Sequence, residues 1–576
     1  MMAYRLRHFL NTAIGPQWGP WLVFFASMAA YLSTLGPGLG PIDSGELAVV
    51  CQTLGIAHPT GYPLYTLLGR MWALAFPWGE LAWRLNLLSA LMMAASASML
   101  FRMLGRLRIR TEAALAGSLA YAFSPVIWSQ AVFLEVYALT AMWSVAVMWL
   151  AVAYRQEGRP RQIMLMAFLT GLGMGNHLSL LWTLGGAAIL LVAGRPRPLV
   201  WLAAAGLFLA GISVYLFMPV RSNLSPLMNW GSPDSWERFL WHVSGRQYRT
   251  WMFGQTAGQL WLNFKNFLAL WLKNPGIYLW WLIIPGGIAL YRKERRILLA
   301  MGTVFLLAVL YGINYSIPDI DPYFIPALVS GYVLMAAGMG WLVESILTLI
   351  PWPRLAIWPR ALMAGVFLLP LALNFAANDQ SHNRLSEDLA SALLESAEPN
   401  AVILVDNWDL YSPCLYLVHH QGLRRDVVLV NKELLRRSWY LDHLKKLYPA
   451  YLAACQIQVE RYQARLSDFE HGRPYNVGEL QSLYQELINA LLLNNYYDNP
   501  PYLTQPRLLG DYDRVAVQYL RIPEGLLYRL KLPGSVENID DRFMFSDRLA
   551  GIDTVKLTPR ERQNYRLWPR DRKSVV

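Results

Sequence analysis

Residues 41–63 read PIDSGELAVVCQTLGIAHPTGYP and follow directly on the first apolar segment of the chain. They place two carboxylates, Asp43 and Glu46, and one imidazole, His58, within a few helical turns of one another. The residues before this stretch are typical of a membrane anchor, and many of those after it are typical of a membrane scaffold. The sequence therefore predicts that this loop carries the chemistry of the protein.

The composition indicates a membrane protein with a separate water-soluble part. Of its 576 residues, 55% are hydrophobic and only 15% are charged, whereas a soluble protein carries about 25% charged residues. The apolar character is concentrated in residues 1–376, which we expect to form a transmembrane domain, and charge increases in residues 377–576. Most of the net charge of +12 lies in short basic loops and the tail, so it does not indicate nucleic-acid binding.

Hydropathy and basic loops predict about eleven transmembrane helices, the last at residues 359–376. A basic segment, 4–8, precedes the first span and places the N-terminus in the cytoplasm. The loop 36–83 and the long segment 219–275 then lie outside, as does the C-terminal domain. We expect a multi-pass protein of the plasma (inner) membrane with an extracytoplasmic C-terminal domain.

The C-terminal domain has the pattern of a soluble α/β fold. Two apolar runs, 401–405 and 426–431, are predicted strands, and residues 411–421 between them are a predicted helix. This βαβ-like unit favours a small parallel sheet. A further helix is expected at 476–497, and strands are expected within 514–531.

The DSGE sequence at residues 43–46 has a structural and a chemical interpretation. In the first, Asp43 and Glu46 form a capping box that satisfies amide groups at a helix start. In the second, Asp43 is the base that takes a proton from an acceptor hydroxyl, because an aspartate with an ordinary pKa of about 3.9 is ionised at neutral pH. His58 has two roles open to it: capping the helix end, or bonding to a donor phosphate or to the carboxylates.

Several polar residues lie where hydropathy predicts membrane depth, and such residues usually face a cavity. Glu135 is expected at the outer end of a hairpin, where the alternative is a water-exposed turn. Asn176 and His177 lie at the tip of a hairpin too short to cross fully, although a core histidine is the commoner case. The predicted substrate cavity comprises these three and Tyr62, Asn229, Trp230 and Asp321.

Arginines on the outer side oppose the positive-inside trend. Arg221 and Arg246 are predicted to bind a donor phosphate, because the guanidinium fork suits phosphate oxygens, and pairing with lipid headgroups is the alternative. The same phosphate site is predicted to include His58, His242 and Tyr248. Asp319 and Asp321 could ligate a divalent ion through oxygen, but two carboxylates are too few, so we expect no metal and no cofactor.

Six short motifs recur in an order that resembles a known family, the transmembrane protein 260-like protein O-mannosyltransferases. They are DSGE at 43–46, HPTGYPL at 58–64, NLLSA at 86–90, EVY at 135–137, GNHL at 175–178 and SGRQY at 244–248. The sequence departs from the expected HPPGYP at Thr60, which bears on the stiffness of the turn more than on the chemistry.

This resemblance implies a C-type glycosyltransferase fold and a polyprenyl-phosphate-linked sugar, with mannose as the best expectation. It implies that Asp43 is the catalytic base, that Glu46 is the second carboxylate, and that the anomeric carbon is inverted. The acceptor would be a hydroxyl, on a protein or a glycan.

Two other functions remain open at this point: a transporter or flippase of a lipid-linked or small polar solute, and a non-catalytic assembly subunit. The transporter is less favoured because the polar groups cluster at one face and no pair of interrupted half-helices is found. The chain also has no Walker A loop, dinucleotide fingerprint, zinc motif or nucleophile elbow.

Overall fold

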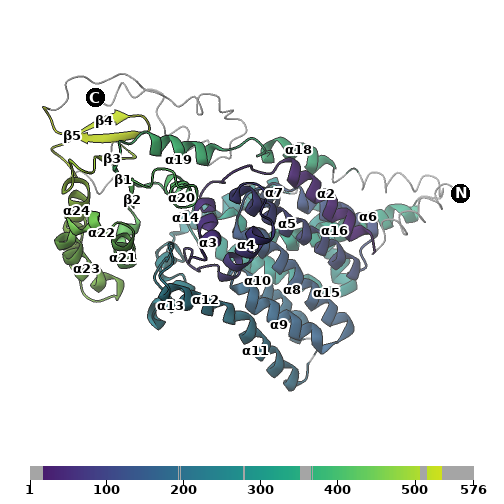
Figure 1. The fold of residues 1–576 in the computed structure, drawn as a ribbon. Helices are drawn as coiled ribbons and strands as arrows, with labels where there is room; N and C mark the ends of the chain where they lie inside the picture. Colours follow the sequence, from purple (N-terminus) through teal and green to yellow (C-terminus); the bar gives the residue numbers. More distant parts are fainter. Residues whose placement is uncertain are drawn as a thin grey trace. The chain divides into compact units, whose positions relative to one another are not determined.

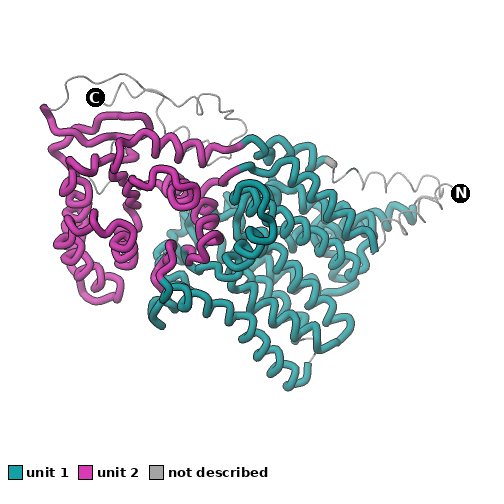
Figure 2. Tube along the Cα trace, in the orientation of Figure 1, with its two compact units in different colours: residues 1–37, 58–224, 234–382 teal, residues 38–57, 225–233, 383–576 magenta. Residues whose placement is uncertain are grey.

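A computed structural model describes residues 17–192, 194, 196–274, 276, 279–349, 365, 368–505 and 515–534. The chain divides into two compact units, shown in Figure 2. The first comprises Met1–Pro37, His58–Leu224 and Asp234–His382, and the second comprises Gly38–Ala57, Ser225–Pro233 and Asn383–Val576. The predicted basic segment 4–8 and part of the predicted span 359–376, namely 359–364, 366 and 367, lie outside the described residues.

The described part of the first unit is helical throughout (Figure 1). Its helices are α2 (Gly19–Ser33), α4 (Pro63–Ala75), α5 (Leu81–Arg106), α6 (Thr111–Ala122), α7 (Pro125–Val132), α8 (Val136–Glu157), α9 (Pro160–Met174), α10 (Leu180–Val192), α11 (Pro198–Ile212), α12 (Phe217–Asn223), α13 (Trp236–Val243), α14 (Ala257–Lys273), α15 (Ile283–Ile313), α16 (Ile325–Leu349) and α18 (Leu368–Asn378). Short 3₁₀ turns join them: η1 (Ser213–Leu216), η2 (Arg246–Trp251), η3 (Trp280–Leu282) and η4 (Asp321–Phe324).

The length and apolar character of these helices make the protein a multi-pass membrane protein. Within the described residues, five helical stretches are long and apolar enough to cross a membrane: Leu81–Arg106, Val136–Glu157, Pro198–Asn223, Trp280–Ile313 and Asp321–Leu349. α2 and α10 are shorter apolar helices. Two spans were predicted on either side of the basic run 292–296, and α15 leaves helical geometry at Glu294 in this run.

Glycines allow close helix packing in this unit. A Cβ atom built at Gly171 of α9 would lie 2.3 Å from the backbone oxygen of Phe208 in α11, and one at Gly338 of α16 would lie 2.1 Å from that of Leu282. Small residues at such positions let helix backbones approach each other, which is how helices associate in lipid.

The second unit contains a five-stranded sheet in the order β2-β1-β3-β5-β4. Its strands are β1 (Val402–Val405), β2 (Val428–Asn431), β3 (Pro501–Leu503), β4 (Leu520–Glu524) and β5 (Leu527–Lys531). β1 is central and parallel to both neighbours, with Ile403 opposite Leu429 and Tyr502. β5 and β4 are antiparallel, so the sheet is mixed, and the expectation of a parallel sheet is right only for its first three strands.

Helices from two distant parts of the sequence pack in this unit. They are α3 (Ser44–Thr53), α19 (Leu385–Glu395), α20 (Trp408–Tyr416), η5 (Leu417–Gln421), η6 (Leu434–Arg436), α21 (Ser438–Leu447), α22 (Pro449–Ala453), α23 (Gln456–Glu470) and α24 (Val477–Leu493). α3 packs against α20, and Figure 2 shows its segment in the same colour as the C-terminal residues. The helical first unit and the α/β second unit confirm the predicted fold class, a polytopic helical domain with an α/β domain.

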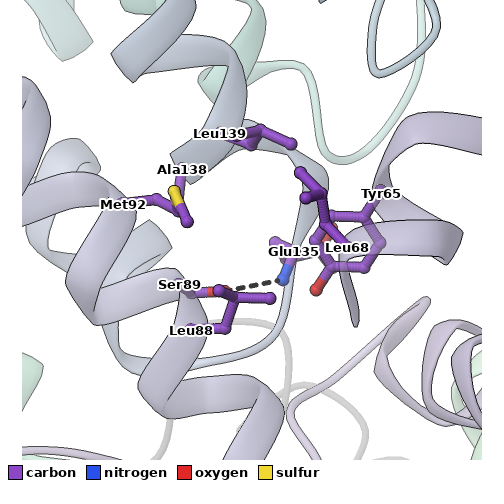
Figure 3. A pocket seen from close by; sticks show the side chains of 8 residues that line it. All are labelled: Tyr65, Leu68, Leu88, Ser89, Met92, Glu135, Ala138 and Leu139. Atoms are coloured by element: carbon purple, nitrogen blue, oxygen red, sulfur yellow. Dashed lines mark hydrogen bonds between the residues drawn. The ribbon is translucent and has the colours of Figure 1, made fainter. Parts of the chain in front are cut away.

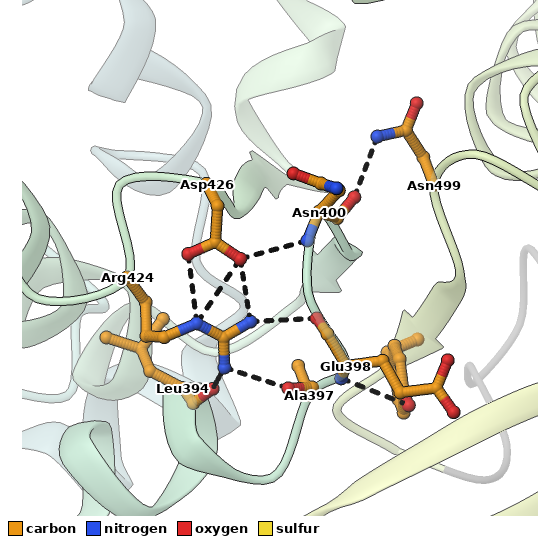
Figure 4. A network of polar contacts seen from close by, with 8 residues as sticks. Leu394, Ala397, Glu398, Asn400, Arg424, Asp426 and Asn499 are labelled. Carbon is orange, nitrogen blue, oxygen red and sulfur yellow. Dashed lines mark hydrogen bonds and ion pairs between the residues drawn. The ribbon is translucent and has the colours of Figure 1, made fainter.

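A polar network fixes the end of α19 to the sheet (Figure 4). One guanidinium nitrogen of Arg424 donates to the carbonyls of Leu394 and Ala397, at 2.7 and 2.8 Å. Asp426 accepts from Arg424 at 2.9 Å and from the amide of Asn400 at 2.9 Å. The hydrogen bond from Arg424 lowers the pKa of Asp426 to about 2. The network satisfies carbonyls that a helix end leaves without partners.

Candidate functional site

Asp43 is the N-cap residue of α3, as predicted, but its side chain does not cap the helix. Its carboxylate makes no cap hydrogen bond to the first turn and instead accepts from the indole Nε1–H of Trp408 at 2.7 Å. The amide of Glu46 donates to the hydroxyl of Ser412 at 2.9 Å. The Asp43 half of the predicted capping box is therefore wrong. α20 supplies partners to both residues, and it lies so close that a Cβ at Gly45 would meet the backbone oxygen of Ser412 at 2.2 Å.

The loop before α3 is held by two carboxylates of the C-terminal domain. The amide of Leu39 donates to Glu387 of α19 at 3.0 Å, and the amide of Ile42 donates to Asp409 of α20 at 3.2 Å. Both carboxylates are 7% exposed. Hydrogen bonds to buried charged groups are among the stronger ones in proteins, so the loop has a defined position within this unit.

The two predicted catalytic carboxylates differ in exposure. Asp43 is half-buried, whereas Glu46, in the first turn of α3, is fully buried. An anion is favoured at a helix N-terminus by the helix dipole. The arrangement therefore provides one accessible carboxylate suited to accepting a proton, with a second carboxylate buried one turn further on.

Asn229 and Trp230 belong to the same unit, where their segment pairs with Ile56 just after α3. The amide of Ile56 donates to Met228 at 2.8 Å, and the amide of Trp230 donates back to Ile56 at 3.2 Å. Both Asn229 and Trp230 are 5% exposed. The ring of Trp230 packs edge-on against that of Trp408, with centroids 5.4 Å apart. Within this unit the structure thus links Trp230 to Asp43 through Trp408, and Asn229 pairs with Ile56 after the end of α3.

In the first unit, His58, Tyr62 and His177 form one group. The Tyr62 hydroxyl lies 2.9 Å from Nε2 of His58, and its ring stacks on His177 with centroids 6.2 Å apart. Tyr137 and Tyr323 surround His177 at 5.2 and 5.0 Å. The histidine at the hairpin tip is therefore a buried residue in an aromatic cluster.

Asn176 connects that hairpin tip to α8. Its Nδ2 donates to the carbonyl of Val136 at 2.9 Å and to the hydroxyl of Thr140 at 2.7 Å. Its Oδ1 is buried and has no hydrogen-bond partner among the described residues. His177 is held by the hydroxyl of Ser179 at 2.8 Å. These contacts give the predicted cavity residues a fixed orientation.

The predicted phosphate-binding residues are also in the first unit. Gly61, at φ +90°, packs on His242, since a Cβ there would lie 3.1 Å from the imidazole. The guanidinium of Arg246 lies over the ring of Trp241 at 4.1 Å. Tyr248 stacks on a neighbouring tryptophan, and Arg221 is half-buried on α12. The contact with Gly61 places His242 next to the turn that carries His58.

The last two cavity candidates lie in different surroundings. Glu135 lines a small, largely apolar cavity between α4, α5 and α8 (Figure 3), and its amide donates to Ser89 at 3.4 Å. The other residues of the lining are Tyr65, Leu68, Leu88, Ser89, Met92, Ala138 and Leu139. Asp321, by contrast, is exposed at the start of η4.

Trp408, Asp409 and Ser412 were not predicted to contact the loop. A partial signal existed, because the polar residues after β1 lie at the carboxyl end of a strand, where α/β proteins place ligand sites. Asn407 in fact caps α20 by accepting from Asp409 at 3.0 Å. The residues that contact the start of α20, Ile42 and Asp43, however, lie more than 350 residues earlier in the chain.

The fold and these residues define a class: a multi-pass helical membrane protein whose α/β domain holds a carboxylate-bearing helix, α3, from the segment after the first apolar helix. Residues 43–199 match the Protein O-mannosyl-transferase TMEM260 N-terminal domain. The chain is 28% identical over 475 residues to Protein O-mannosyl-transferase TMEM260 of Mus musculus, covering 75% of this chain. It is 23% identical over 478 residues to the protein of that name from Dictyostelium discoideum, covering 73% of this chain.

These matches confirm the resemblance predicted from the motifs, to the transmembrane protein 260-like O-mannosyltransferases. The matched regions span 66% and 58% of the two relatives' own lengths.

Solved structures of ArnT from Cupriavidus metallidurans are also similar, each at 14% identity. The apo state has a TM-score of 0.48, covering 72% of this chain and 91% of that one. The state bound to undecaprenyl phosphate has a TM-score of 0.46, covering 74% and 91%.

Proposed function

We propose that this chain is a membrane-embedded inverting glycosyltransferase of the C-type fold. It moves a sugar, with mannose as the first candidate, from a polyprenyl-phosphate donor to an acceptor hydroxyl, which is expected on a protein. The relatives are named protein O-mannosyl-transferases. The family motifs include the predicted catalytic residues and several of the predicted phosphate-binding and cavity residues.

One observation carries the role of Asp43 in this proposal. A capping carboxylate would be occupied by the amides of its own helix, but Ser412 takes the amide of Glu46 and Asp43 accepts from Trp408 instead. The amide of Glu46 is therefore satisfied without the Asp43 side chain. A half-buried carboxylate held by a neighbouring donor suits a general base.

In the proposed step, the oxygen of the acceptor hydroxyl attacks the anomeric carbon from the face opposite the phosphate. The new carbon–oxygen bond forms as the bond to the phosphate oxygen breaks, and the electron pair leaves with the polyprenyl phosphate. Asp43 takes the hydroxyl proton. Attack from the opposite face inverts the configuration of the anomeric carbon.

The first unit would bind the donor. Arg221, Arg246, His58, His242 and Tyr248 are proposed to offset the charge of the leaving phosphate, which is a preorganised electrostatic contribution. Glu46, buried behind Asp43 in α3, is proposed to tune the base. The proposal includes no metal, and it places the reaction at the extracytoplasmic face of the plasma (inner) membrane.

The experiment is a transfer assay with the purified protein in lipid nanodiscs. Polyprenyl-phosphate mannose is the donor, with GDP-mannose as the matched donor of another class, and the product is analysed by NMR for anomeric configuration. We expect transfer only from the lipid donor, with inversion. Retention of configuration, or equal use of the nucleotide sugar, would contradict the proposal.

The transporter alternative makes a separate prediction for the same sample. In sealed vesicles it requires movement of a labelled lipid-linked sugar across the bilayer without chemical transfer. Such movement, lost in Asp43→Asn, would replace the transferase proposal.

A further inference from the structure

Trp408 makes a distinctive contact with Asp43. The indole Nε1–H donates to Oδ1 of Asp43 at 2.7 Å, across 365 residues of sequence. This length is typical of a hydrogen bond to an ionised acceptor. Because indole is a donor only, it can hold a carboxylate oxygen but cannot take a proton from a carboxylic acid.

The indole itself is firmly held. Its ring lies 5.4 Å from Trp230 at 82° and 5.7 Å from Tyr411 at 40°. Trp230 packs in turn on Trp439 of α21, at 5.1 Å. Aromatic contacts of this kind add to the free energy of burial, so three segments of the chain fix the direction of the N–H bond.

The same turn of α20 also holds the backbone on both sides of Asp43. Asp409 accepts from the amide of Ile42, and Ser412 accepts from the amide of Glu46. Asp409 thus contacts the residue before Asp43, Trp408 contacts the side chain of Asp43, and Ser412 contacts the first turn after it. One turn of the C-terminal domain sets both the backbone and the side chain of the proposed base.

We propose that Trp408 is the positioning residue of Asp43, which makes the C-terminal domain part of the catalytic machinery. This inference rests on the proposed function of Asp43 as general base. A bond at Oδ1 fixes the plane of the carboxylate, so an incoming hydroxyl meets the base in one orientation. Holding reacting groups in a productive geometry is a large part of catalysis.

The first test is Trp408→Phe in the nanodisc transfer assay, because phenylalanine keeps an aromatic ring and removes only the N–H donor. We expect kcat to fall roughly 10- to 100-fold, the range for loss of one hydrogen bond to a charged group. The KM for polyprenyl-phosphate mannose should stay within about threefold, since ground-state binding of the donor is unaffected. Trp201→Phe, at an exposed tryptophan of α11 outside the proposed site residues, is the matched control and should keep the parent kcat.

The second test measures coupling. The residual transfer rate of Asp43→Asn is compared with that of the double variant Asp43→Asn/Trp408→Phe. If Trp408 acts only through Asp43, the second substitution should not lower this rate further. An equal loss in both backgrounds would show a general structural role and overturn the inference. The inference would also be overturned if Trp408→Phe kept the parent kcat while Asp43→Asn was only weakly active. Full activity of Asp43→Asn would overturn the proposed function itself.

Discussion

The two units hold their candidate site residues by different means. In the second unit, α3 and its preceding loop are held by hydrogen bonds from residues 348 to 367 positions away in sequence. In the first unit, His58, Tyr62 and His177 are held by one another and by ring packing. The difference suggests a division of labour, in which changes around α3 alter kcat and changes in the first unit alter donor binding.

Among the variants that test this comparison between the units, the largest effect is expected for Gly45→Ala. The added Cβ would meet the backbone of Ser412 at 2.2 Å, and two helix backbones cannot yield as a flexible side chain can. We expect a loss of about 1–3 kcal/mol in the free energy of unfolding from overpacking. Displacement of the proposed base should lower kcat about 100-fold. Thermal unfolding and the transfer assay measure the two effects.

The control is Gly302→Ala in α15, where a Cβ would meet nothing within 4 Å. It should leave both stability and kcat close to those of the parent protein. If Gly45→Ala behaved like Gly302→Ala, the packing of α3 on α20 would be wrong, and with it the comparison of the two units.

A smaller effect, on donor binding, is expected for Arg246→Gln. Loss of a guanidinium that binds phosphate should raise the KM for polyprenyl-phosphate mannose roughly 10-fold, with kcat changing much less. Arg465→Gln, which removes an equal charge from an exposed ion pair on α23, is the control. A fall in kcat at constant KM would contradict the division between the units.

The smallest effect concerns pH and is confined to the C-terminal domain. Burial lowers the pKa of His443 in α21 to about 4, and the charges of His419 and Lys446 act in the same direction. The unfolded chain, with a histidine pKa of about 6.5, then binds more protons, so the stability falls as the pH drops from about 6.5 to about 4.

His443→Phe keeps the ring packing against Tyr440 and removes the titrating group. The thermal midpoint of this variant should depend less on pH between about 6.5 and 4, and should run parallel to the parent between pH 7 and 8. Parallel curves over the whole acid range would show that His443 does not contribute.

Local patterns predicted the elements well. The apolar runs led to β1 and β2, and the turn between the short helices α9 and α10 falls at the predicted residues, Asn176 and His177. β3 was missed because three residues that begin with a proline, Pro501, carry too little periodicity to indicate a strand.

The surroundings of Asp43 could not be predicted from the sequence. The DSGE motif correctly indicated a helix start, because capping preferences depend on adjacent residues. Whether Asp43 or another group satisfies the amides of that helix depends on Ser412 and Trp408, which tertiary packing brings in from hundreds of residues away. Periodicity and spacing carry no information about such contacts.

The most direct test of the account is the single-turnover transfer rate of Asp43→Asn with polyprenyl-phosphate mannose already bound. Asp498→Asn, an exposed residue in the turn after α24, is the matched control. We predict that Asp43→Asn keeps donor binding and transfers about 10²- to 10⁴-fold more slowly, as expected for loss of a general base, while Asp498→Asn keeps the parent rate. A parent-like rate in Asp43→Asn, or a slow rate explained by lost donor binding alone, would contradict the account.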